Sequence, residues 1–188
     1  MKLNIAVAAA LLLSAAVALP AAAQAPCTSS SWDVRHEVAL FGSAAQALTA
    51  GTGRNAAPSI RAERLYDLRL MPQPQVRFAM APGKAMLSDG AYAGLVKLKV
   101  AQPGSYRISV DVPFWIDVVA AGKELPTEDF TGLRGCSSGP RKLVQFVLPA
   151  NEELLLQFSG ATRAQLRMSV TKAPPALAHG HGSAPASP

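Results

Sequence analysis

From Arg64 onward, apolar residues alternate with polar ones in a series of short segments, most of them separated by proline or glycine. A period of two places every second side chain on one face of a β-strand, so each segment is expected to bury one face. The expected strands span 65–70, 76–80, 95–100, 106–112, 114–119, 143–148, 154–158 and 166–170. Short strands at near-regular intervals are typical of a sandwich or barrel and not of a parallel α/β sheet. We therefore predict an all-β fold, a Greek-key or jelly-roll-like β-sandwich of about eight strands.

The stretch 32–50 fits two local structures. Val34, Val38 and Phe41 are spaced by four and three residues, as on one face of a helix. His36 and Leu40 alternate with their neighbours as they would in a strand. We expect either a short N-terminal helix or a strand followed by a helical turn.

One local motif favours a Greek-key arrangement. Pro103-Gly104 is followed by Ser105 and Tyr106, the Pro-Gly-x-Tyr order of a tyrosine corner. In that motif the bend precedes a strand, and the tyrosine hydroxyl bonds the backbone a few residues upstream. Tyr106 is therefore expected to be a structural residue.

The two ends of the chain have compositions unlike the middle. Lys2, an apolar stretch over 5–19 and small residues at Ala21 and Ala23 form the pattern of a signal peptide, 1–23. Cleavage after Ala23 would leave one domain, 24–172, in the periplasm or secreted, without a transmembrane segment. The tail 173–188 is rich in Ala, Pro, Gly and Ser, cannot bury enough surface to fold, and is expected to be disordered.

The sequence contains two cysteines, Cys27 and Cys136, and both follow the leader. An even number of cysteines in an oxidising compartment predicts a disulfide. This bridge would close a loop of about 110 residues and stabilise the fold by on the order of 4–5 kcal/mol in the chain-entropy model.

Charge and aromatic content limit the choice of partners. The formal net charge is +6 at pH 7, and cleavage would remove only Lys2, so an anionic glycan or an envelope protein is the expected partner. Aromatic residues make up 6% of the chain, which argues against a stacking platform for nucleic acid or long glycans. Phe114 and Trp115 are adjacent, so one can enter the core while the other is exposed for sugar stacking. The expected binding residues are Trp115, Arg134, Arg141 and Lys142.

Two stretches carry a resemblance to a known family. Gly94-Leu95-Val96-Lys97-Leu98-Lys99-Val100 and Gly104-Ser105-Tyr106-Arg107-Ile108-Ser109-Val110 resemble strands of the pre-peptidase C-terminal type of β-sandwich. The resemblance implies a non-catalytic module of the kind that accompanies secreted enzymes. The chain is also similar to small exported bacterial proteins, some of which are labelled homogentisate 1,2-dioxygenase. That label implies an iron site of two histidines and a carboxylate, whereas His36 is the only histidine outside the tail.

The titratable residues suggest three further sites. Asp111 and Asp117 could form a glycosidase-type carboxylate pair. Glu124, Glu128 and Asp129, expected on a loop, could bind calcium, and His179 with His181 could bind a metal weakly. In each case a structural or solvated role is the simpler interpretation, as it is for His36 and Glu37, and no cofactor is expected.

Three functions stay open from sequence. The leading one is a non-catalytic periplasmic or secreted binding or accessory module. The alternatives are a metal-dependent oxygenase, as the label on similar proteins suggests, and a structural protein of envelope assembly.

Overall fold

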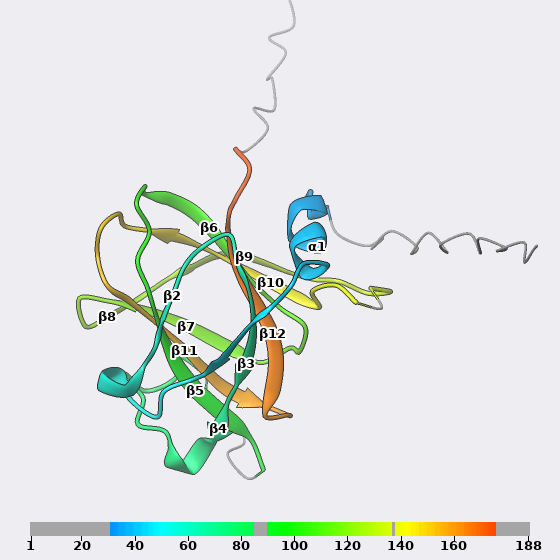
Figure 1. The fold of residues 1–188 in the computed structure, drawn as a ribbon. Coiled ribbons are helices and arrows are strands. Elements are labelled where there is room, and N and C mark those ends of the chain that lie inside the picture. Colours follow the sequence, from blue (N-terminus) through cyan, green and yellow to red (C-terminus); the bar gives the residue numbers. More distant parts are fainter. Residues whose placement is uncertain (1–30, 85–89, 137, 176–188) are drawn as a thin grey trace, which may run out of the picture.

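The computed structural model describes residues 31–84, 90–136 and 138–175 of the chain. Within these ranges it contains one α-helix and twelve strands in two mixed sheets, which confirms the prediction of an all-β sandwich (Figure 1). The expectations for the leader, for Cys27 and for His179 and His181 concern residues outside the described ranges.

The first sheet, sheet A, has the strand order β1-β3-β12-β6-β10-β9. Its strands are β1 (Gln46–Thr49), β3 (Leu65–Arg69), β12 (Gln165–Lys172), β6 (Gly104–Val110), β10 (Lys142–Leu148) and β9 (Thr127–Gly132). All neighbours in this sheet are antiparallel except β1 and β3, which run parallel.

The second sheet, sheet B, has the order β2-β5-β11-β7-β8, with β4 also paired to β5. Its strands are β2 (Ser59–Ile60), β5 (Tyr92–Leu98), β11 (Leu154–Ala161), β7 (Trp115–Ala120), β8 (Lys123–Leu125) and β4 (Met71–Pro72). Only β2 and β5 pair in parallel. Because β8 leads directly into β9, the chain crosses here from the edge of sheet B to the edge of sheet A.

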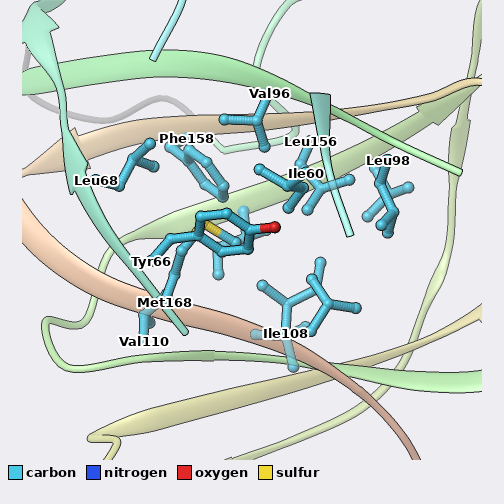
Figure 2. Close-up of a cluster of buried hydrophobic side chains, with 14 of the residues drawn as sticks. Ile60, Tyr66, Leu68, Val96, Leu98, Ile108, Val110, Leu156, Phe158 and Met168 are labelled. Carbon is cyan, nitrogen blue, oxygen red and sulfur yellow. The ribbon is translucent and has the colours of Figure 1, made fainter. Parts of the chain in front are cut away.

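The main core lies between the two sheets and is built from the alternating residues that the sequence pattern picked out. Leu68 and Ile108 of sheet A and Leu156 and Phe158 of sheet B are fully buried there. Figure 2 shows these side chains around Tyr66, with Met168 and Val96 close by. Burying each such side chain contributes roughly 1.5–3 kcal/mol, so this layer provides most of the driving force for the sandwich.

The N-terminal stretch 32–50 forms a helix followed by a strand. The helix α1 (Arg35–Phe41) lies beside β12 on the outer face of sheet A (Figure 1). Val34 packs with Leu133, Cys136 and Leu143 in a small second cluster beneath it. His36 bonds Glu63 at the surface, with 2.6 Å between Nε2 and Oε2.

Two sequence-based expectations for local structure were wrong. Residues 76–80 alternate like a strand, but they belong to an irregular segment, 76–84, that crosses the outer face of sheet B. Its backbone bonds the Gln157 side chain instead of a strand: the amides of Ala79 and Met80 donate to Gln157 Oε1 at 2.6 and 3.1 Å. Val76 packs there against the outer apolar residues of sheet B, which explains the strand-like pattern. We call 76–84 the strap.

The second wrong expectation concerns Glu124, Glu128 and Asp129. They were expected on a loop, but they lie on β8 and β9, the two edge strands at one side of the sandwich. Edge strands tolerate polar residues because one flank faces solvent, and this explains why their apolar pattern is weak.

The tyrosine corner is present. Tyr106 is buried, and its hydroxyl donates to the carbonyl of Gln102 over 3.0 Å. The bond joins the bend at Pro103-Gly104 to the start of β6 and so fixes the direction in which the chain enters that strand. Across the described residues, no helix has the length and apolarity needed to span a membrane.

Candidate functional site

The sandwich has a hollow on the side where the edge strands lie. It lies between β7 of sheet B and the β9–β10 pair of sheet A and has a volume of about 310 Å³. Its walls are Trp115, Ile116, Thr127, Glu128, Asp129, Phe130, Lys142 and Val144. We call it the aromatic pocket. Trp115 and Lys142, both predicted as binding residues, therefore line the same cavity.

Trp115 lines this pocket because its neighbour fills the core. Phe114 is buried and packs edge-to-face on Phe158, with 5.6 Å between ring centres. Trp115 is the first residue of β7 and is only partly buried. This division of roles between the adjacent rings is the one that the sequence suggested.

Three polar groups hold the Trp115 ring in place. Its Nε1 donates to Asp117 Oδ1 over 2.6 Å. The Nζ atoms of Lys84 and Lys142 each lie 5.8 Å from the ring centre, within the range of a cation–π contact. The indole is therefore fixed before a ligand arrives, which lowers the entropy lost on binding.

Asp117 connects the pocket to the strap. Its carboxyl is almost fully buried and accepts the amide of Gly83 at 3.3 Å as well as the indole of Trp115. A Cβ on Gly83 would lie 2.7 Å from Glu124 Oε1 and 3.0 Å from Asp117 Oδ1, so a larger residue here would require the flexible Glu124 side chain to move. Burial raises the pKa of Asp117, the hydrogen bonds from Trp115 and Gly83 oppose this shift, and Glu124 adds to it.

Lys142 provides the positive charge of the pocket. Its ammonium group donates to the carbonyl of Phe114 over 2.7 Å. Burial lowers the pKa of Lys142, and the positive charge of Lys84 lowers it further. Lys142 thus brings a partly desolvated cation to a pocket that is also lined by Glu128 and Asp129.

The acidic residues of the pocket have partners of their own. Glu128 Oε2 accepts hydrogen bonds from Ser105 and Gln145, at 2.8 and 3.1 Å. Gln145 also accepts from Arg107, which belongs to the outer face of sheet A. Asp129 Oδ1 accepts the amide of Phe130 over 2.7 Å. Each of these two carboxylates at the rim of the pocket therefore accepts at least one hydrogen bond from the protein.

Phe130 is the pocket residue that the sequence analysis missed. Its side chain is 68% exposed although it lies on a strand, and it lines the pocket together with Trp115. The signal was visible, because Phe130 is the only aromatic residue in the polar stretch from Lys123 to Gly132.

Arg134 and Arg141 do not line the aromatic pocket. They border a second hollow of about 640 Å³, together with Asp111, Val112, Pro113 and Arg163. The predicted binding residues are thus divided between two neighbouring hollows, because Arg134 and Arg141 lie in the connection between β9 and β10, whereas Trp115 and Lys142 lie on strands.

The carboxylate pair considered for catalysis is not assembled. Asp111 follows β6 of sheet A and bonds Arg163 at 3.2 Å and the amide of Arg167 at 2.8 Å. Asp117 lies in sheet B beneath the strap. Each carboxyl therefore has its own partners in a different sheet.

The calcium ligands considered from sequence are also separated. Glu124 lies on β8 beside Asp117, whereas Glu128 and Asp129 lie on β9. Over the described ranges, no three residues among His, Cys, Asp and Glu gather closely enough to hold a metal ion.

Comparison with known proteins gives no family for this chain. No protein-family model matches it, and no curated protein matches it either. Any functional assignment must therefore be argued from the geometry of these hollows.

Proposed function

We propose that this protein is a non-catalytic binding module, exported to the periplasm or secreted, whose aromatic pocket takes one acidic sugar unit of an anionic glycan. The observation that carries the proposal is the juxtaposition of Trp115 and exposed Phe130 with the Lys142 ammonium in one pocket of about 310 Å³.

Sugars suit this combination of groups. The C–H face of a pyranose ring is apolar and packs on an aromatic ring, while its hydroxyls remain at the edge for polar partners. Ligand pockets typically combine apolar walls with a few polar groups that fix the orientation of the ligand. A carboxylate on the sugar would reach Lys142, and the hydroxyls would face Thr127 and Asp129 at the rim.

The test measures binding of galacturonate and its short oligomers by titration calorimetry, with the methyl esters as uncharged counterparts. Lys142→Met should weaken binding of the acid by about tenfold, because a charge-assisted hydrogen bond is worth roughly 1.5–3 kcal/mol. Binding of the ester should change little. Trp115→Ala should weaken both ligands.

Lys99→Met is the matched control, since Lys99 is exposed directly after β5 and does not line the aromatic pocket. Equal binding of acid and ester by the unmodified protein, or equal losses in the Lys142 and Lys99 variants, would refute the acidic-sugar assignment.

A protein partner is the second candidate, and one observation favours it. β9 is the edge strand of sheet A, so the backbone groups on its outer flank face no strand of this sheet. An extended segment of an envelope protein could pair with this edge and place a side chain over Phe130. Cross-linking from a photoreactive residue at position 130 in intact cells would test it: a single discrete adduct supports a protein partner, and no adduct argues against one.

A further inference from the structure

A groove lined by arginines continues from the aromatic pocket around the end of the sandwich. The hollow beside Arg134 and Arg141 shares Asp111 and Arg163 with a further hollow of about 590 Å³. That third hollow lies over the ends of β1, β3 and β12 and contains Arg69, Arg167 and Gln165. We call the two hollows together the arginine groove.

The groove and the aromatic pocket are lined by neighbouring residues of the same three segments. The segments 112–116, 130–134 and 141–144 each contribute residues to both the pocket and the adjoining half of the groove. A chain-like ligand that leaves the pocket past Pro113 and Gly132 therefore enters the groove without crossing another element.

Some of the charges in the groove are paired and others are not. Asp111 binds Arg163, and Asp67 lies 3.7 Å from the Nε of Arg167. Arg69 and Arg141 are exposed, and within the described residues their guanidinium groups make no hydrogen bond or ion pair. Five arginines face two carboxylates here, so the groove is positive, and its two unpaired cations lie on either side of the Arg163–Asp111 pair.

We infer that the arginine groove binds the continuation of a linear acidic polysaccharide whose first acidic sugar occupies the aromatic pocket; this inference rests on the proposed function. Carboxylates of successive sugars would pair with Arg141 and Arg69, because guanidinium groups bind carboxylates through two parallel hydrogen bonds.

The carboxylates in the groove favour a polysaccharide over a chain of phosphates. Asp67 and Asp111 would repel either anionic chain, but a chain of phosphates has no hydroxyl groups that could donate to these carboxylates and offset the repulsion. They would accept hydrogen bonds from sugar hydroxyls, as would the Gln165 amide. Among the described residues, no aromatic side chain lines the groove, so charge and hydrogen bonds would hold the ligand there instead of stacking.

The test compares galacturonate monomer, trimer and long oligomers on the full mature chain. Affinity should rise with length and fall with added salt, because exposed charges are screened within about 10 Å at 0.1 M salt. The double variant Arg69→Gln/Arg141→Gln should bind the long oligomer about tenfold or more weakly and the monomer as before.

Arg61→Gln/Arg64→Gln is the matched control, since it removes the same charge from the exposed turn before β3, at the opposite end from Arg69. Equal losses in the two double variants would overturn the groove and leave a general charge effect. Affinity independent of oligomer length would overturn it as well. Inorganic polyphosphate bound as tightly as the oligomer would overturn the assignment to a polysaccharide.

The same series separates the two proposals. Long oligomers that bind Trp115→Ala but not the Arg69/Arg141 variant would support the groove and refute the pocket. Monomer binding that needs Trp115, without any gain from length, would support the pocket and refute the groove. A failure of every oligomer to bind would refute both.

Discussion

Asp117 is a buried acid whose protonation the fold favours, and it holds both the strap and the Trp115 ring. Its folded-state pKa lies above the ordinary value of 3.8, first because of burial. The folded protein therefore binds more protons than the unfolded chain at this position, and its stability falls as the pH rises from about 4 through the raised pKa. Below about 4 both states are protonated, and the group contributes no pH dependence.

Asp117→Asn should remove this effect, since its amide oxygen can still accept from Trp115 and Gly83 but carries no charge. Urea unfolding midpoints measured from pH 4 to 7 should shift progressively in favour of the variant as the pH rises. Glu124→Gln should show the same trend more weakly, because Glu124 is a smaller cause of the raised pKa. A constant gap between Asp117→Asn and the unmodified protein at all pH values would contradict the assignment.

Residues whose role is set by their neighbours in sequence were the ones that could be predicted. Tyr106 is an example, because the bend and the hydroxyl acceptor both lie within four positions of it. Asp117 and Gln157 are the opposite case. Their partners in the strap come from 34 and 77–78 positions away, and no local pattern specifies such contacts. The position of Phe130 in the aromatic pocket depends in the same way on where β7 and β10 lie.

The helix α1 is attached to sheet A through a buried ion pair. Glu37 is 1% exposed and lies 3.2 Å from Arg107 of β6, while Thr171 of β12 donates to the same carboxylate oxygen over 3.1 Å. Arg107 also donates to the carbonyl of Asp33 and lies over the Trp32 ring, 4.5 Å from its centre. The segment from Trp32 to Glu37 is thereby fixed to the outer face of the sheet.

The two ends of this ion pair should respond differently to substitution. Arg107→Met leaves the Glu37 charge buried without its counterion and should cost about 3–5 kcal/mol of unfolding free energy. Glu37→Met should cost less, since Arg107 keeps Asp33, Gln145 and Trp32 as partners. Glu37→Met/Arg107→Met should be more stable than Arg107→Met alone.

Equilibrium urea unfolding of the four proteins forms a double-mutant cycle that measures the coupling. Arg35→Met is the control, because the Arg35–Asp33 pair is exposed on the same segment and its loss should leave stability near that of the unmodified protein. Additive effects of the two Met substitutions would show that the ion pair does not hold the helix.

Elements were predictable where one face is buried against a single partner. The central strands of sheet A, β6, β10 and β12, alternate clearly because the inner face of each packs in the core, whereas β5, β7 and β11 of sheet B are buried on both faces and are recognised as short apolar runs. The strap shows the same alternation because Val76, Phe78 and Met80 also pack on a sheet. Its backbone, however, hydrogen-bonds the Gln157 side chain and not a neighbouring strand. The edge strands β8 and β9 carry few apolar residues, so no period was visible in them.

At the scale of the whole molecule, the fold class followed from sequence but the location of the hollows did not. Strand count and turn spacing specify a sandwich, whereas the strand order within each sheet decides which edges meet. That order brings β9 and β10 opposite β7 and forms the aromatic pocket; it also places the ends of β3 and β12 beside Asp111 and forms the groove. The residues predicted to bind a ligand consequently line two neighbouring hollows instead of one face, and their binding role stays a prediction.

The predicted disulfide would join the start of the mature chain to the cluster under α1. Cys136 is buried there beside Val34 and Leu133, and Cys27 precedes α1 by eight residues in the sequence. The bridge should therefore act on two levels. It should stabilise the whole fold by on the order of 4–5 kcal/mol through the large closed loop. It should also suppress local opening of α1, which has only seven residues and depends on its tertiary contacts.

Hydrogen exchange of the oxidised and the reduced mature protein, followed by mass spectrometry, measures both effects. On reduction, amides of 35–41 should exchange much faster, while those of β6 and β11 should change only through the lower global stability. The Cys27→Ser variant, kept under oxidising conditions, should reproduce the reduced pattern, because it removes the bridge without adding a reductant. If reduction left both the exchange of α1 and the melting temperature unchanged, the two cysteines would not be joined, and α1 would depend on the Glu37–Arg107 pair and its apolar contacts alone.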